Sequence, residues 1–195
     1  MHAIQVHQFG GPEVLRYEQL PCPEPGPGEV LIRVHAVGMN PPDRYQRTGF
    51  VDFPESLWPT DLVLPLTPGS DFSGVIAAVG DGVSEFREGD AVFGLVRFPA
   101  LLNNGGRTYA EYTTSPVSNL AHKPASIDHV HASGVPMSGL TAYQYLVEHI
   151  QLYAGMTVFI NGAAGGVGHF LLQLAKIKDA HVIRCRLHPP RSVPG

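Results

Sequence analysis

Met156-Thr157-Val158-Phe159-Ile160-Asn161-Gly162-Ala163-Ala164-Gly165-Gly166-Val167-Gly168 is the stretch of sequence that decides the fold. It is an apolar run that turns on small residues into an apolar-periodic segment, His169 to Lys178. This pattern predicts a strand, a phosphate-binding turn and a helix. Small residues at Ala163, Gly165 and Gly168 allow a tight turn, close approach of a pyrophosphate and packing of the helix on the strand. A plain strand-to-helix loop is the alternative, but the flanking periodicities favour a dinucleotide site.

The segment after the glycine turn predicts one strand-turn-helix-strand unit. The helix is expected from Gly166 to Lys178 and a short parallel strand from Ala180 to Ile183, joined by a right-handed crossover. A doubly wound dinucleotide fold contains two such halves, so residues 126–183 are predicted to form a partial Rossmann domain. The segment 184–195 is rich in proline and arginine, and we expect it to be poorly ordered.

The first 125 residues have a different texture, because short alternating runs are separated by glycine and proline turns. This spacing predicts a small β-barrel. Helical spacing appears only later, from Ser138 to Ile150, after a helix start predicted at Pro124 to Asp128. The strands are predicted at Ala3 to Val6, Leu15 to Tyr17, Glu29 to Val37, Gly74 to Gly80, Asp90 to Gly94 and Tyr109 to Thr114. The predicted fold is therefore α/β with a barrel domain, 1–125, before the coenzyme domain.

The composition excludes several classes of protein. The net charge of −4, with scattered basic residues, offers no stripe for a nucleic-acid backbone. No apolar run approaches the ~20 residues of a membrane helix, and the N-terminus does not resemble a signal peptide. The two cysteines, Cys22 and Cys185, cannot form a disulfide framework or a four-cysteine zinc site. We therefore expect a cytoplasmic protein without nucleic-acid or membrane partners. The ten histidines are dispersed, and we expect them to be solvated.

Several ordered motifs run from about residue 3 to about residue 183. They are Phe9 to Leu15 (FGGPEVL), Pro27 to Ile32 (PGEVLI), Gly38 to Asp43 (GMNPPD), Pro68 to Gly74 (PGSDFSG) and the glycine turn Gly162 to Gly168. Together they resemble the quinone oxidoreductase, or zeta-crystallin-like, branch of the medium-chain dehydrogenases. The resemblance implies a GroES-like barrel domain joined to a Rossmann domain and NADPH bound between them. It also implies hydride transfer to a small-molecule quinone or α,β-unsaturated carbonyl. Relatives commonly pair as homo-oligomers through edge strands of the coenzyme domain that this chain lacks, so the sequence leaves the oligomeric state open.

Zinc-dependent relatives place cysteine, histidine and glutamate around a catalytic metal. This chain has Asn40, Ser70 and Asp71 at the matching positions. Neither an amide nor a hydroxyl is a preferred zinc ligand, so we expect no metal site. Hydride transfer to an electrophile polarised by conjugation does not require a Lewis acid, and zinc-independent chemistry is the consistent expectation.

The resemblance also implies site residues. Asn40 and Tyr45 are expected as the catalytic pair that orients the reactants, and Asn40 and Thr141 are expected near the nicotinamide. Phosphate contacts are expected from Ala163, Ala164, Gly165, Gly166, Val167 and Gly168. Each of the three side chains also has a structural alternative: Asn40 as a turn residue before two prolines, Tyr45 as a half-buried aromatic, and Thr141 as a helix-packing residue.

The residues after Asp179 bear on the coenzyme preference, and the segment after Tyr45 bears on the substrate. An NAD site commonly has an acidic residue ~20 positions beyond the glycines, whereas no acid follows Asp179. Arg184 and Arg186 fall where a 2'-phosphate would lie, which favours NADP. Relatives often carry a second tyrosine shortly after Tyr45, but the sequence here is Thr48 to Val51 (TGFV), which weakens the expectation of quinone itself.

A second hypothesis concerns the partial coenzyme domain. Parallel sheets are normally covered on both faces, and a two-stranded parallel sheet has little with which to cover them. Under this second hypothesis, the chain is a catalytically incompetent fragment that binds a nucleotide weakly or pairs with another subunit. The apolar side chains expected to be exposed in a monomer are Val158, Ile160, Leu171, Leu172 and Leu174.

Overall fold

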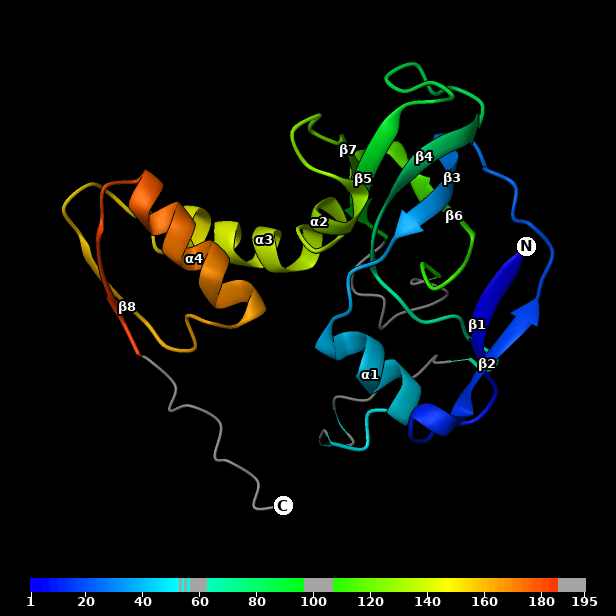
Figure 1. Cartoon of the computed structure of the whole chain (residues 1–195), viewed down its shortest axis with the longest axis horizontal. Coiled ribbons are helices and arrows are strands. Elements are labelled where there is room, and N and C mark those ends of the chain that lie inside the picture. Colours follow the sequence, from blue (N-terminus) through cyan, green and yellow to red (C-terminus); the bar gives the residue numbers. More distant parts are fainter. Residues whose placement is uncertain (53, 55, 57–62, 97–106, 186–195) are drawn as a thin grey trace. The chain divides into compact units, whose positions relative to one another are not determined.

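The computed structural model describes residues 1–52, 54, 56, 63–96 and 107–185, and most of its helices and strands are labelled in Figure 1. The chain divides into two compact units, Met1–Met137 and a second that begins at Ser138. The first unit contains β1 (His2–Val6), η1 (Pro12–Val14), β2 (Leu15–Gln19), β3 (Glu29–Ala36), α1 (Pro41–Thr48), β4 (Asp71–Val79), β5 (Ala91–Leu95), β6 (Tyr112–Pro116), η3 (Val117–Asn119), β7 (Leu120–His122) and α2 (His129–Ser133).

The first unit is built on a five-stranded antiparallel sheet with strand order β6-β3-β4-β5-β7. The buried positions of β3 alternate, because successive side chains of a strand point to opposite faces. Register shifts at Leu31/Ile32 and Val34/Ala36 bend β3 against β4. The core cluster on this sheet comprises Val30, Ile32, Phe72, Ile76, Val92 and Val96. β1 and β2 form a separate antiparallel hairpin (Figure 1).

Most predicted strands are present, and three features of the first unit differ. β6 begins at Tyr112 rather than Tyr109, and β7 is an additional short strand. α1 is a helix that the sequence pattern does not predict, because Asn40 before two prolines is also typical of a turn. The prolines occupy the first helical positions, where a missing N–H costs nothing. The helix ends at Gly49, whose φ of 71° is the left-handed conformation that glycine adopts freely.

The second unit contains the predicted strand-turn-helix-strand. α3 (Pro136–Tyr143) leads into the unit and continues as a π-helical turn, η4 (Gln144–His149). β8 (Thr157–Ile160) precedes the glycine turn, α4 (Gly166–Ile177) follows it, and β9 (His181–Arg184) pairs with β8 in parallel. The predicted order of elements and the parallel pairing are confirmed.

The two-stranded sheet β8-β9 is covered on one face. Val158 and Val182 are register partners and pack with Leu171 and Leu174 of α4 around a small buried cluster. Ile160 is buried, and Val158, Leu171, Leu172 and Leu174 are half-buried, so the predicted exposure of these side chains is wrong. The exposed apolar residues lie on the other face, because side chains alternate along a strand. Phe159 and Ile183, also register partners, are 64% and 55% exposed.

A search of the described part of the chain finds no helix with the length and apolar character needed to cross a membrane.

Candidate functional site

Two buried carboxylates mark the candidate site in the first unit. Asp43, in the first turn of α1, is 5% exposed, and Asp71, the first residue of β4, is 1% exposed. Asp43 accepts hydrogen bonds from Ser70 Oγ at 2.9 Å and from the Tyr109 hydroxyl at 3.2 Å. It also accepts the backbone N–H of Asn40 at 2.8 Å, which closes the N-terminus of α1.

Asp71 binds a different set of donors. The side-chain amide of Asn40 donates from Nδ2 to Asp71 Oδ2 at 3.0 Å. The backbone N–H of Met137 lies 3.1 and 3.2 Å from the two carboxylate oxygens. A side chain at Gly38 would place its Cβ 2.5 Å from the Ser133 carbonyl oxygen and 2.9 Å from Asp71 Oδ2, so only glycine permits this approach. Asn40 therefore touches both carboxylates, one through its backbone and one through its side chain.

Burial changes the proton affinity of this cluster. Burial raises the pKa of Asp71 to about 6, the hydrogen bonds from Asn40 and Met137 oppose this rise, and the charge of Asp43 adds to it. Burial also raises the pKa of Asp43, against the hydrogen bonds from Asn40, Ser70 and Tyr109. Burial and the neighbouring Asp43 raise the pKa of the Tyr109 hydroxyl, which therefore stays protonated as a donor. The cluster holds a proton more readily than exposed carboxylates do.

The raised pKa of Asp71 predicts that this residue makes stability fall as pH rises. An acid with a folded-state pKa above its unfolded value stabilises the fold fully below the unfolded pKa, and this contribution is lost as pH rises through about 6. Between about pH 5 and about pH 7.5 the wild-type chain should lose about 1 kcal/mol more unfolding free energy than Asp71→Asn. Urea denaturation of both chains at both pH values measures this difference. Parallel pH profiles of the two chains would contradict the prediction.

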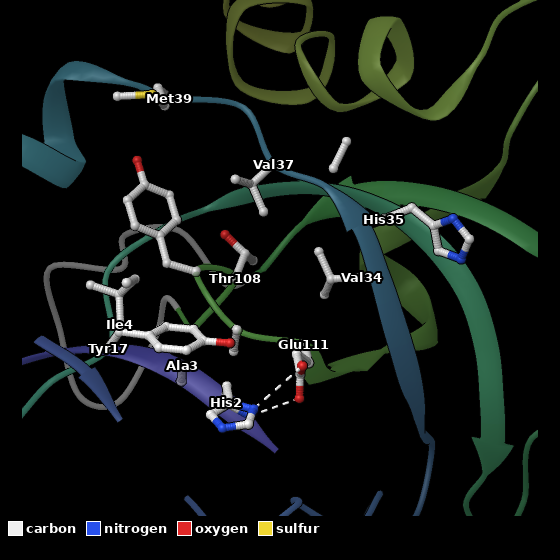
Figure 2. Close-up of a pocket in the computed structure, with 13 residues that line it drawn as sticks. His2, Ala3, Ile4, Tyr17, Val34, His35, Val37, Met39, Thr108 and Glu111 are labelled. Atoms are coloured by element: carbon white, nitrogen blue, oxygen red, sulfur yellow. Dashed lines mark hydrogen bonds and ion pairs between the residues drawn. The ribbon is translucent and has the colours of Figure 1, made fainter. Parts of the chain in front are cut away.

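A pocket of about 460 Å³ lies beside the carboxylate cluster in the first unit. Figure 2 shows Val34, Val37 and Met39 along one side and the β1-β2 hairpin on the other, where His2 contacts Glu111. Its lining consists of His2, Ala3, Ile4, Tyr17, Val34, His35, Ala36, Val37, Met39, Thr108, Tyr109, Ala110 and Glu111. The pocket and the carboxylate cluster share Tyr109.

The glycine turn is the candidate phosphate site in the second unit. A side chain at Gly168 would place its Cβ 2.1 Å from the Gly162 carbonyl oxygen and 2.7 Å from Ala163 Cα, so the helix begins directly against the turn. Gly165 is the N-cap of α4, and no side chain caps the helix there. The first N–H groups of a helix have no acceptor within the helix, so this exposed turn presents them to an anion.

The residues predicted for the site fall into the two units. Asn40 is the N-cap of α1 and is joined to Asp71, whereas Tyr45 is half-buried on α1 with its ring 6.3 Å from that of Phe50. Phe50 is buried and lies in the segment Thr48 to Val51, which contains no second tyrosine. In the second unit the residues 163–168 form the turn and the start of α4.

Thr141 is a half-buried residue of α3. It lies one helical turn after Ser138, and a Cβ on Gly166 would meet Ser138 Oγ at 2.9 Å. The start of the second unit thus adjoins the glycine turn. The sequence pattern predicts no role for Asp43 or Tyr109. The spacing of Asn40 and Asp43 is nevertheless typical of a capping box, which is the local signal for Asp43.

Among the residues with described positions, no group of three or more histidine, cysteine, aspartate or glutamate side chains could hold a metal ion.

The fold and the site define the class of protein. Residues 26–125 match the family model of the alcohol dehydrogenase GroES-like domain, and the chain belongs to this family. Among its relatives, the human quinone oxidoreductase is 38% identical over 177 residues, which are 90% of this chain and 50% of the human protein. The predicted resemblance to the quinone oxidoreductase branch of the medium-chain dehydrogenases is confirmed.

Solved structures agree with this assignment. The quinone oxidoreductase from Coxiella burnetii has a TM-score of 0.83 and 36% identity, covering 94% of this chain and 56% of that one. The Escherichia coli quinone oxidoreductase, solved in complex with NADPH, has a TM-score of 0.78 and 29% identity, covering 94% of this chain and 52% of that one. The chain spans about half the length of the curated relatives that it matches.

Proposed function

We propose that this chain carries the reactant-orienting residues and a phosphate site of an NADPH-dependent oxidoreductase, which transfers hydride to a quinone or an α,β-unsaturated carbonyl without zinc. The single observation that carries the proposal is the open glycine turn at the uncapped N-terminus of α4. The similarity to an NADPH-complexed quinone oxidoreductase supports the choice of coenzyme.

The glycine turn fits the pyrophosphate of a dinucleotide. A Cβ at Gly162 would meet no atom within 4 Å, and one at Gly165 would meet only the Gly162 carbonyl oxygen, at 3.3 Å. The main chain is therefore open to a ligand at the residues that precede α4. Ala163, Ala164, Gly165, Gly166, Val167 and Gly168 would hold the phosphates through backbone N–H groups and the helix dipole.

The first unit would orient the reactants. Asn40 would contact the nicotinamide and the acceptor through its side-chain amide, which Asp71 holds by a hydrogen bond. Tyr45 would contact the acceptor from α1. In the second unit, Thr141 of α3 would contact the nicotinamide carboxamide. The coenzyme supplies hydride when bound, and the protein's part is to bind, orient and exclude water.

Titration of the purified 195-residue chain with NADPH, followed by nicotinamide fluorescence, tests the proposal. We expect saturable binding that is tighter than that of NADH, and turnover with 1,4-benzoquinone or an enone as acceptor. Binding of neither coenzyme would overturn the phosphate site. Binding without turnover of any quinone or enone would overturn the activity. A folded control for this titration needs a glycine that tolerates alanine. Gly134, with a φ of −83°, accepts alanine, whereas Gly82, with a φ of 79°, does not.

Arg184 is the residue that we expect to set the preference for NADPH over NADH. It ends β9 and is the register partner of Ile160, the last residue of β8 before the glycine turn. The carboxyl ends of parallel strands meet at one edge of the sheet, so Arg184 and the turn share that edge. Arg184→Ala should weaken NADPH binding about tenfold and leave NADH binding unchanged, because it removes a partner of the 2'-phosphate. Arg186 lies outside the described residues.

The matched control for Arg184 is Lys176→Ala, which removes an exposed cation from the last turn of α4. Both variants are titrated with NADPH and NADH by fluorescence. An equal loss of NADPH affinity in the two variants would show that net charge, rather than a site at Arg184, sets the preference.

The second candidate function is that of a catalytically incompetent module that pairs with another subunit. The exposed Phe159 and Ile183 favour it, because an apolar sheet face of this kind is normally covered. Analytical ultracentrifugation and steady-state turnover of the same preparation separate the two candidates. Robust turnover by the monomeric chain would exclude the second.

A further inference from the structure

We propose that Asp71 is a positioning residue, which holds the side-chain amide of Asn40 in one orientation and ties it to the end of the first unit at Met137. Its use in catalysis rests on the proposed function, in which Asn40 contacts the nicotinamide. The side chains of Asn40 and Asp71 bind each other.

The contacts of Asp71 show how one carboxylate serves two segments. Its Oδ2 accepts from Asn40 Nδ2 at 3.0 Å, and both of its oxygens lie within 3.2 Å of the Met137 N–H. Asp71 is 1% exposed, so water cannot replace these donors at low cost. The carboxylate thus connects the N-cap of α1 with Met137, the last residue of the first unit.

The backbone around Asp71 is packed to keep it in this place. Gly38 approaches so closely that any Cβ would lie 2.9 Å from both Asp71 Cβ and Oδ2. Asp43 holds the backbone of Asn40 independently, through the Asn40 N–H at 2.8 Å. The backbone of Asn40 and its side chain are therefore fixed by different carboxylates, and only the side chain depends on Asp71.

Within the described part of the chain, few charged or titratable groups neighbour Asp71. The charge of Asp43 from α1 raises the pKa of Asp71, and the charge of Asp71 in turn raises the pKa of Tyr109, which precedes β6. Protonation of Asp43 changes the partner of the Asn40 backbone N–H, whereas protonation of Asp71 changes the partner of the Asn40 side chain and of the Met137 N–H. These two events can be told apart at the level of individual nitrogen atoms.

NMR of the ¹⁵N-labelled 195-residue chain tests the proposal without any coenzyme. In Asp71→Ala the Asn40 side-chain NH₂ and the Met137 amide should exchange with water about tenfold faster. Asp71→Asn keeps one acceptor oxygen and should restore slow exchange at Asn40. Val92→Ala, a core truncation in β5, is the control for lost stability alone. Equal exchange at Asn40 in wild type and Asp71→Ala, or equal acceleration in Val92→Ala, would overturn the proposal.

A titration of the wild-type chain keeps the test valid if Asp71→Ala does not fold. The Asn40 side-chain and Met137 amide resonances should move together with one midpoint near the pKa of about 6 that burial gives Asp71. Unequal midpoints, or no movement, would overturn the proposal.

The catalytic use is tested separately. With NADPH and 1,4-benzoquinone, Asp71→Ala should lower kcat about tenfold and change the KM for NADPH little, and Asp71→Asn should recover part of kcat. Absence of NADPH binding to the wild-type chain would be a failure of the proposed function, while the exchange data would still decide the role of Asp71.

Discussion

Gly168→Ala is expected to unfold the start of α4 and abolish dinucleotide binding. The new Cβ would lie 2.1 Å from the Gly162 carbonyl oxygen and 2.7 Å from Ala163 Cα, and these are backbone atoms that cannot rotate away. The helix would have to separate from the glycine turn, at a cost of about 3 kcal/mol or more. Hydrogen exchange of the amides of α4, measured by mass spectrometry, should rise by more than about 100-fold. NADPH titration should show no saturable binding.

Gly165→Ala is the matched control for Gly168. Gly165 lies in the same turn with a φ of −78°, and its Cβ would come no closer than 3.3 Å to the Gly162 carbonyl oxygen. Its loss of stability should stay near 1 kcal/mol, because alanine is only a poorer N-cap. If the amides of α4 exchange at the same rate in Gly168→Ala and Gly165→Ala, close packing at Gly168 does not hold the turn.

Asp43→Ala should cause the largest loss of stability in the first unit. It leaves three donors without their acceptor: Ser70 Oγ, the Tyr109 hydroxyl and the Asn40 backbone N–H. A buried donor that loses its partner costs about 1–3 kcal/mol, so the variant should lose about 3 kcal/mol or more in total. The melting temperature, measured by circular dichroism, should fall by roughly 10 °C.

Asp52→Ala provides the comparison for Asp43. Asp52 also contacts α1, through Arg44 at 2.7 Å, but both side chains of this ion pair are at least half exposed. Exposed pairs of this kind contribute less than about 1 kcal/mol, so the melting temperature should barely change. A similar fall in both variants would mean that the buried hydrogen bonds of Asp43 do not carry the stability of the first unit.

The sequence predicts the parts of this protein that depend on local pattern. Alternation identifies β3, and the apolar run with its small-residue turn identifies β8, the phosphate turn and α4. These features depend on neighbours along the chain, because the period of the side chains and the freedom of glycine are local properties. The ordered motifs added the family, which the match over residues 26–125 and the similarity to the human quinone oxidoreductase confirm.

Local pattern was less informative where two structures share one signature. Asn40 followed by two prolines suits a turn and also the first turn of a helix, and the structure selects the helix α1. The prediction that Ile160 would be exposed was wrong because α4 covers that face of the sheet and leaves Phe159 in solvent. A strand pattern shows alternation but does not show which face is covered.

The sequence by itself determined the classes of the two units and the place of the glycine turn. Tertiary structure alone decided the carboxylate cluster of the candidate site in the first unit. Asp43, Asp71 and Tyr109 are separated by 28 to 66 residues, and no pattern of local spacing connects them. Folding of the sheet brings them together around Asn40 and removes them from water, and this burial gives their hydrogen bonds strength and raises the pKa of Asp71.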